Sequence, residues 1–122
     1  MKLNYDCVRE VLLYIEENLQ YGQILYSSDI ELENYEYEDV QYTIDLLADS
    51  AYIKANKLQV LGPTLPSFHI YSLTMQGHEL LDNIRDNSVW KKIKKKISGL
   101  ASVSLPIINS LGSTIIKEIL FQ

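Results

Sequence analysis

The stretch that decides the fold reads Leu73-Thr74-Met75-Gln76-Gly77-His78-Glu79-Leu80-Leu81. It joins a strand-like run, residues 68–73, to a helix that we expect over residues 75–86. Thr74 ends the strand and caps the helix, because its hydroxyl oxygen can accept a hydrogen bond from an amide of the first turn. Gly77 lies one turn into the helix and allows it to approach a neighbour closely, since glycine has no Cβ. Three side chains of this helix are expected to point inward: Leu80, Leu81 and Ile84.

A β-hairpin is predicted directly before this stretch. Residues 52–61 are rich in β-forming residues, and residues 68–73 supply the second strand. Between them, residues 62–67 carry two prolines and form a loop of about six residues. Further upstream, residues 24–26 are a short strand candidate, and residues 27–34 indicate a turn or a short helical turn.

Two helices precede the hairpin. Asn4 is the expected N-cap of the first, which ends between residues 18 and 22 and buries an apolar stripe of Val8, Val11, Leu12, Ile15 and Leu19. The second is expected over residues 36–50. Its inner face should consist of Tyr37, Val40, Ile44 and Leu47. Its outer face should consist of Glu38, Gln41, Tyr42, Asp45 and Asp49.

Two more helices follow the stretch. Ser88 is the expected cap of the first, which carries apolar residues on one side (Val89, Trp90, Ile93, Ile97 and Leu100) and lysines on the other (Lys91, Lys92, Lys94, Lys95 and Lys96). Ser104 or Ser102 opens the last helix, with Pro106 in its first turn. Its wide apolar face (Ile107, Ile108, Leu111, Ile115, Ile116, Ile119 and Leu120) either closes the core or pairs with a copy of itself in a homodimer.

Helix, short strand, helix and hairpin follow one another in the order of a winged helix. The predicted fold class is therefore mostly α with a small β-hairpin (α+β), a winged helix-turn-helix with a C-terminal helical extension. Residues 1–86 would form the winged-helix domain, and residues 87–122 would pack on it or serve in dimerisation. The helix at 36–50 takes the recognition position, and residues 62–67 form the wing tip.

A longer pattern adds a resemblance. The string Leu73-Thr-x-x-Gly-His78-x-Leu80-Leu-Asp82-x-Ile84-Arg85-Asp86-x-x-x-Trp90-x-x-x-Lys94 resembles the signature of an uncharacterised family of small proteins from Gram-positive bacteria and their prophages, a domain of unknown function. The resemblance covers nearly the whole chain. It implies a winged-helix fold and a phage-associated origin, and it implies no activity. The family often has a histidine where this chain has Thr43, so any role of that histidine is absent here.

The 122 residues suit one domain, and their net charge of −5 hides a segregation of charge. From Glu10 to Ile53 there are 11 acidic residues and no lysine or arginine. From Lys54 to Gln122 there are nine basic and four acidic residues. The acidic block therefore covers the helix that a winged-helix protein normally presents to DNA, and this surface should repel a duplex.

The sequence does not indicate an enzyme. It has no glycine-rich phosphate loop, no G-x-S-x-G motif and no C-x-x-C motif. His69, His78 and Asp82 could supply three zinc ligands, but a surface network of His78, Asp82 and Arg85 is the preferred interpretation. Cys7 is interpreted as a small half-buried side chain rather than a reactive thiol. We expect no cofactor and no metal.

The segment from Ile97 to Ile116 has 20 uncharged residues, the length of a membrane span. Half of these residues are Ser, Thr, Asn, Gly or Pro, which argues against a span and against a membrane partner. The N-terminus has no apolar run of the kind found in secretory signals, so a cytoplasmic location is expected.

Two hypotheses for function remain open. The first is a nucleic-acid-binding transcriptional regulator that uses a non-standard basic face, made of Lys54, Lys57, Lys91, Lys92 and Lys95. The second is a protein-binding module, or an acidic inhibitor of a host protein, that uses the acidic, tyrosine-containing outer face of the 36–50 helix: Glu38, Gln41, Tyr42, Asp45 and Asp49. Tyrosines interleaved with carboxylates favour the second hypothesis, because aromatic residues are enriched at protein interfaces.

Overall fold

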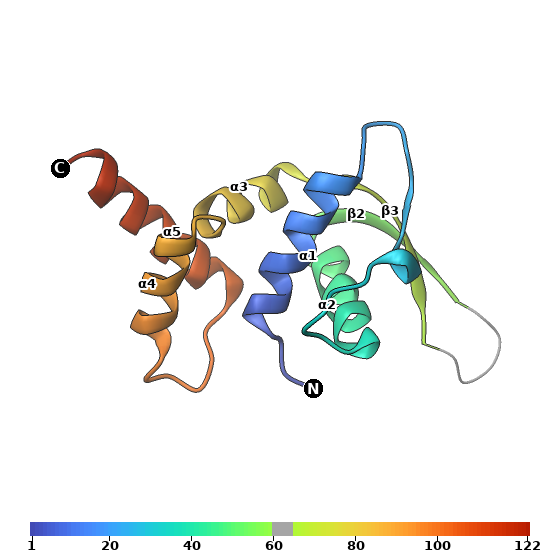
Figure 1. Ribbon diagram of the computed structural model, residues 1–122, viewed down its shortest axis with the longest axis horizontal. Helices are drawn as coiled ribbons and strands as arrows, with labels where there is room; N and C mark the ends of the chain where they lie inside the picture. The colour runs from blue at the N-terminus through green and yellow to red at the C-terminus, as the bar shows by residue number, and fades with distance from the viewer. Residues whose placement is uncertain (60–64) are drawn as a thin grey trace. The chain divides into compact units, whose positions relative to one another are not determined.

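The computed structural model describes residues 1–59 and 65–122. Figure 1 shows their elements, which are α1 (Tyr5–Asn18), β1 (Leu25–Tyr26), the 3₁₀-helix η1 (Ser27–Asp29), α2 (Tyr37–Asp49), β2 (Ile53–Leu58), β3 (Ser67–Leu73), α3 (Met75–Ile84), α4 (Asn87–Ile97) and α5 (Leu105–Leu120). The mostly helical α+β class and the predicted order of elements are confirmed. Half of the predicted wing tip, residues 62–64, lies outside the described residues.

The chain divides into two compact units, Met1–His78 and Glu79–Gln122. The division falls within α3, whereas the sequence suggested a boundary after residue 86. Within the first unit, the helices and the sheet are arranged like a winged helix.

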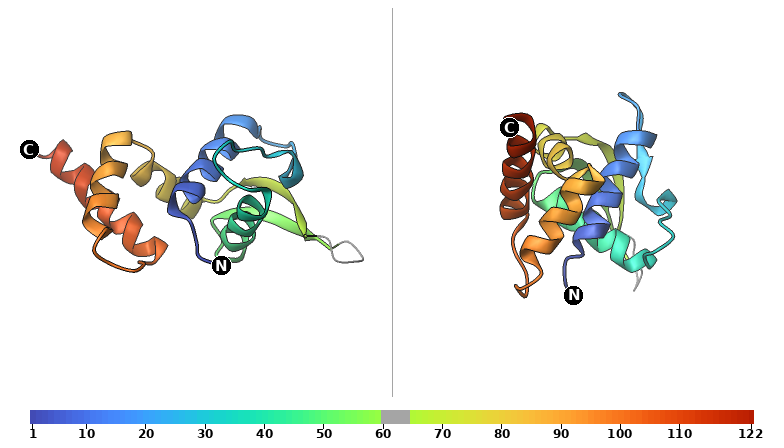
Figure 2. Two further views of the ribbon diagram at one scale, coloured as in Figure 1. Left: turned by 60° about the horizontal axis from the view of Figure 1, so that its bottom comes forward. Right: turned by 60° about the vertical axis from the view of Figure 1, so that its left-hand side comes forward.

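The first unit contains a three-stranded antiparallel sheet in the order β1-β3-β2. Strands β2 and β3 form the long hairpin in Figure 1, with Ile53 opposite Leu73 and Leu58 opposite Ser67. The register shifts between Lys54 and Ala55, so β3 carries a bulge there. Helices α1 and α2 pack against each other, and each also contacts β3 (Figure 2).

Two predicted helix caps are confirmed in this unit. Asn4 Oδ1 accepts a hydrogen bond from the Cys7 amide at 3.1 Å. Thr74 Oγ1 accepts one from the Gly77 amide at 3.0 Å, and the same hydroxyl donates to Ala51 O at 2.6 Å. A Cβ on Gly77 would collide with the Tyr52 carbonyl oxygen, so the close approach is to the backbone that follows α2.

The core of the first unit contains the predicted apolar residues of α1 and α2, with two corrections. The buried side chains include Val8, Val11, Leu12, Ile15, Val40, Ile44, Leu47, Phe68 and Ile70. Tyr37, predicted to face inward, is 45% exposed, because it lies in the first turn of α2, where the helix has only begun to cross the core. Cys7 is fully buried rather than half-buried, because it lies at the contact between α1 and α2.

In the second unit, α4 and α5 lie side by side (Figures 1 and 2). The N-cap of α4 is Asp86 rather than Ser88: Asp86 Oδ1 accepts from the Val89 amide at 2.9 Å and from the Ser88 hydroxyl at 2.7 Å. Helix α3 ends at Ile84, two residues earlier than expected, so Asp86 lies outside α3 and can be the N-cap of α4.

The apolar face predicted for the last helix is only partly buried. Ile108 and Ile115 are buried, and a Cβ on Gly112 would collide with the Asn83 carbonyl oxygen. Five large apolar residues between positions 100 and 121 are at least 46% exposed: Leu100, Ile107, Ile119, Leu120 and Phe121. Within the described residues, no helix has the length and apolar character needed to cross a membrane.

Candidate interaction surfaces

The outer side of α2 forms an acidic face, which we define as Glu36, Glu38, Tyr42, Asp45 and Asp49. The last four are spaced by four, three and four positions, so they follow one side of the helix. Glu36, Glu38 and Asp49 are exposed, while Asp45 and Tyr42 are half-exposed. No lysine or arginine lies in α2. The acidic surface predicted at the recognition position is therefore present, although Tyr42 is less exposed than expected.

Gln41, predicted on this outer face, is buried with only 3% of its surface exposed. Its Nε2 donates to the Ser27 carbonyl at 2.9 Å. Ser27 Oγ in turn accepts a hydrogen bond from the Phe68 amide at 2.7 Å. Helix α2 thus buries a wider arc than its apolar residues indicate, because η1 covers the side that carries Gln41. Gln41 is a structural residue and not part of the candidate surface.

The two wing-strand lysines differ in their surroundings. Lys57 Nζ lies 3.3 Å from Asp45 Oδ2, on the acidic face. Lys54, three residues earlier on β2, is exposed. The structure therefore brings together one residue proposed for nucleic acid and one proposed for a protein partner, and their charges offset each other.

Helix α4 carries a lysine face, which we define as Lys91, Lys92, Lys94, Lys95 and Lys96. All five side chains are exposed. The opposite side of the helix is anchored by Trp90 and Ile93, which are 5% and 0% exposed. Three of the lysines lie in the last turn, where cations interact favourably with the helix dipole. These lysines belong to the second unit, whereas Lys54 and Lys57 belong to the first.

A hollow of about 350 Å³ adjoins the acidic face. Residues 2–6 form one side of it, and Asp39, Tyr42 and Thr43 form the other. Thr43 Oγ1 donates to the Asp39 carbonyl at 2.8 Å and lies 3.4 Å from Cys7 Sγ. The lining thus combines tyrosine side chains with the carboxylates of Asp6 and Asp39, which suits a cationic group.

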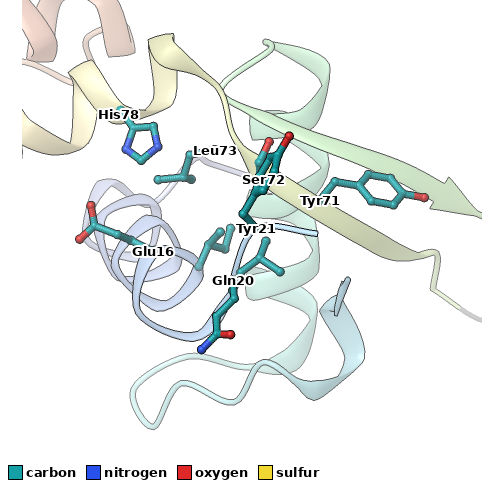
Figure 3. A pocket seen from close by; sticks show the side chains of 9 residues that line it. Glu16, Gln20, Tyr21, Tyr71, Ser72, Leu73 and His78 are labelled. Atoms are coloured by element: carbon teal, nitrogen blue, oxygen red, sulfur yellow. The ribbon is translucent and has the colours of Figure 1, made fainter. Parts of the chain in front are cut away.

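A smaller hollow of about 200 Å³ lies between the end of α1 and the end of β3. Figure 3 shows Glu16 and His78 at this hollow, with Tyr71 pointing away from it along the sheet. No motif predicts this hollow, since Glu16 and His78 lie far apart in the chain.

The residues considered for zinc are not gathered into a site. His69 stacks edge-on against Tyr26, with ring centroids 4.9 Å apart, and Asp82 pairs with Arg85 at 3.0 Å. Among residues 1–59 and 65–122, no three His, Cys, Asp or Glu side chains are close enough to share a metal ion.

Cys7 is buried next to Thr43, which lines the hollow beside the acidic face. Burial raises the pKa of its thiol above the ordinary value of 9.0, the hydrogen bond with Thr43 lowers it, and the nearby Asp39 and Glu10 carboxylates raise it further. A thiol of this kind is unreactive in the folded protein, because the thiolate is the reactive form.

These features define a small winged-helix-like protein with an acidic surface on α2 and a basic surface on α4. The chain belongs to the family described as hypothetical protein DUF2513, whose model matches residues 2–104. It is 34% identical over 122 residues to an uncharacterized protein of Haemophilus influenzae, covering 98% of this chain and 99% of that protein. No solved structure matches the chain. The match confirms membership of a family of unknown function, while the Gram-positive or prophage origin stays a prediction.

Proposed function

We propose that this protein is a non-enzymatic interaction protein whose acidic face binds a basic surface of another protein. The observation that carries the proposal is the exposed side of α2. It presents carboxylates and a tyrosine, and α2 itself carries no lysine or arginine, at the position where a winged helix normally presents its recognition helix. The family that the chain matches has no named activity, and the match names no partner.

Electrostatics favours a protein partner for this surface. DNA affinity comes largely from lysine and arginine contacts to phosphates, and carboxylates at the same place repel the duplex. The nearest wing lysine, Lys57, is already paired with Asp45. Tyr42 adds an aromatic group of the kind that is enriched at protein interfaces. A phage-type protein with such a surface would suit the role of an inhibitor of a basic host protein.

The lysine face supports a second candidate function. Helix α4 has five exposed lysines and no acidic residue between Asn87 and Ile97. Such a helix can contact phosphates without any base-specific readout, as a transcriptional regulator with a non-standard basic face would do. Lys54 could add to this surface, whereas Lys57 would first have to separate from Asp45.

Two titrations distinguish these functions, one with a lysine-rich peptide and one with a duplex DNA, each in about 0.1 M and about 1 M salt. Replacing Glu38→Gln and Asp49→Asn removes two exposed charges. Since an exposed ion pair contributes about 0.2–1 kcal/mol, peptide affinity should fall about 2- to 30-fold. Tyr42→Ala should weaken peptide binding as well.

The matched control is Glu31→Gln with Glu118→Gln, which removes the same charge from exposed positions outside the acidic face. Its affinity for the peptide should stay close to that of the wild type. Tight, salt-dependent DNA binding that Lys91→Glu with Lys92→Glu abolishes, together with no peptide binding, would favour the regulator instead.

A further inference from the structure

The two compact units carry opposite charges. The unit Met1–His78 has 12 acidic and 4 basic residues, a formal charge of −8, and the unit Glu79–Gln122 has 4 acidic and 7 basic residues, a formal charge of +3. The acidic face belongs to the first unit and the lysine face to the second. We propose that the basic partner of the acidic face is a second copy of this chain, which docks through its lysine face. This inference rests on the proposed function.

The two faces match in form as well as in charge. Each is the exposed side of one helix, 13 residues long in α2 and 11 residues long in α4. From Glu38 to Asp49 the acidic face extends about 16 Å along the helix axis, and from Lys91 to Lys96 the lysine face extends about 8 Å. Along the helix axis, the lysine face is therefore short enough to fit within the length of the acidic face.

The hollow beside the acidic face offers a concave place for a lysine side chain. Its volume of about 350 Å³ is lined by Asp39, Tyr42 and Asp6. The aliphatic stem of a lysine can pack on the tyrosine ring while its ammonium group meets the carboxylates. Lys2 of the same chain also lines the hollow, is exposed and would have to move aside.

A dimer with two-fold symmetry would contain the contact between α2 and α4 twice. In a symmetric dimer, α4 of each copy meets α2 of the other, so one set of residues supplies both sides of the interface. Exposed ion pairs are individually weak and are screened by salt, so the dimer should form at low salt and dissociate at high salt.

Sedimentation velocity tests the proposal with two charge-reversal variants, Lys91→Glu with Lys92→Glu and Glu38→Lys with Asp49→Lys. The wild type should sediment as a dimer in about 0.1 M salt and as a monomer in about 1 M salt. Each variant alone should raise the dimer dissociation constant at least about tenfold, because like charges then face each other across the interface. An equal mixture of the two variants should regain the dimer, because both contacts become complementary again.

The control is Glu31→Lys with Glu118→Lys, which changes the charge equally at exposed positions of neither face. It should leave the dimer intact, and circular dichroism should show that all variants are folded. A wild type that is monomeric at both salt concentrations would overturn the proposal. So would a salt-insensitive dimer that is lost on Ile119→Asp, since the C-terminal helix would then be the interface. If the wild type is monomeric but binds the peptide, the proposed function is retained and only the second copy as partner is excluded. If the wild type neither dimerises nor binds the peptide, both the proposed function and this inference are wrong.

Discussion

Lys57 on strand β2 reaches across to Asp45 on helix α2, with 3.3 Å between Nζ and Oδ2. The two side chains are 42% and 37% exposed, so water screens the pair. We predict that Lys57→Gln changes the free energy of unfolding by less than about 1 kcal/mol. Urea denaturation measures this, with Lys54→Gln on the same strand as the control. A loss well above that limit for Lys57→Gln alone would mean that the pair holds the hairpin against α2.

A substitution at Gly77 tests the close approach between α3 and the backbone at Tyr52. A Cβ at this position would collide with the Tyr52 carbonyl oxygen, which cannot move aside as a flexible side chain could. Gly77→Ala should therefore lower the free energy of unfolding by about 1–3 kcal/mol. Gly99→Ala is the matched control, because a Cβ there has no atom within 4 Å. Equal stability of the two variants would contradict the packing described here.

Ser27 connects three elements through two hydrogen bonds. Its hydroxyl accepts from the Phe68 amide, and its carbonyl accepts from Gln41. Ser27→Ala leaves a buried amide without its acceptor and should cost about 1–3 kcal/mol of stability. Ser28→Ala, at the exposed neighbouring position, should cost much less. Thermal or urea unfolding of both variants gives the comparison, and similar losses would show that the Ser27 hydroxyl is dispensable.

Cys7 should make the protein less stable at alkaline pH. Burial raises the pKa of its thiol in the folded state above the ordinary 9.0, so the folded state holds this proton when the unfolded chain releases it. Its contribution is complete below about pH 9 and is lost as the pH rises toward the folded-state pKa. Unfolding experiments from about pH 7 to about pH 10 should show a shallower decline for Cys7→Ala than for the wild type.

Tyr35 and Tyr52 also have raised pKa values, mainly because of burial, and both add to the decline from about pH 10 upward in either protein. If the free energy of unfolding falls equally steeply with pH in the wild type and in Cys7→Ala, Cys7 is not a cause of the decline. In the folded wild type, a thiol reagent at neutral pH should modify Cys7 only as fast as the protein opens.

Local rules predicted much of this fold. Thr74 and Asn4 were found from capping preferences, because a cap depends on residues within one turn of it. The close approach at Gly77 was also predicted, and the structure shows that the neighbour is the backbone carbonyl of Tyr52. The predicted cap Ser88 was wrong: Asp86 caps α4, because α3 stops before it, and capping rules do not determine where α3 stops.

The candidate surfaces were less predictable where distant segments meet. Helical periodicity placed Gln41 outside, because it shows which residues are apolar but not how wide an arc the neighbouring elements cover. Burial of Gln41 requires the Ser27 carbonyl, 14 residues away, as its partner. The pairing of Lys57 with Asp45 likewise depends on the hairpin lying beside α2, and no spacing in the sequence encodes it.

The most direct test of the central claim is an amide-resolved NMR titration of the labelled protein with a lysine-rich peptide in about 0.1 M salt. We predict that the amide signals of Glu38, Tyr42 and Asp49 shift as the peptide binds to the acidic face. A duplex DNA should leave the α2 signals unchanged. Two results would contradict the assignment of the acidic face as a protein-binding surface. One is peptide binding without a shift of these α2 signals, and the other is a shift of the same signals caused by a duplex DNA bound at α2.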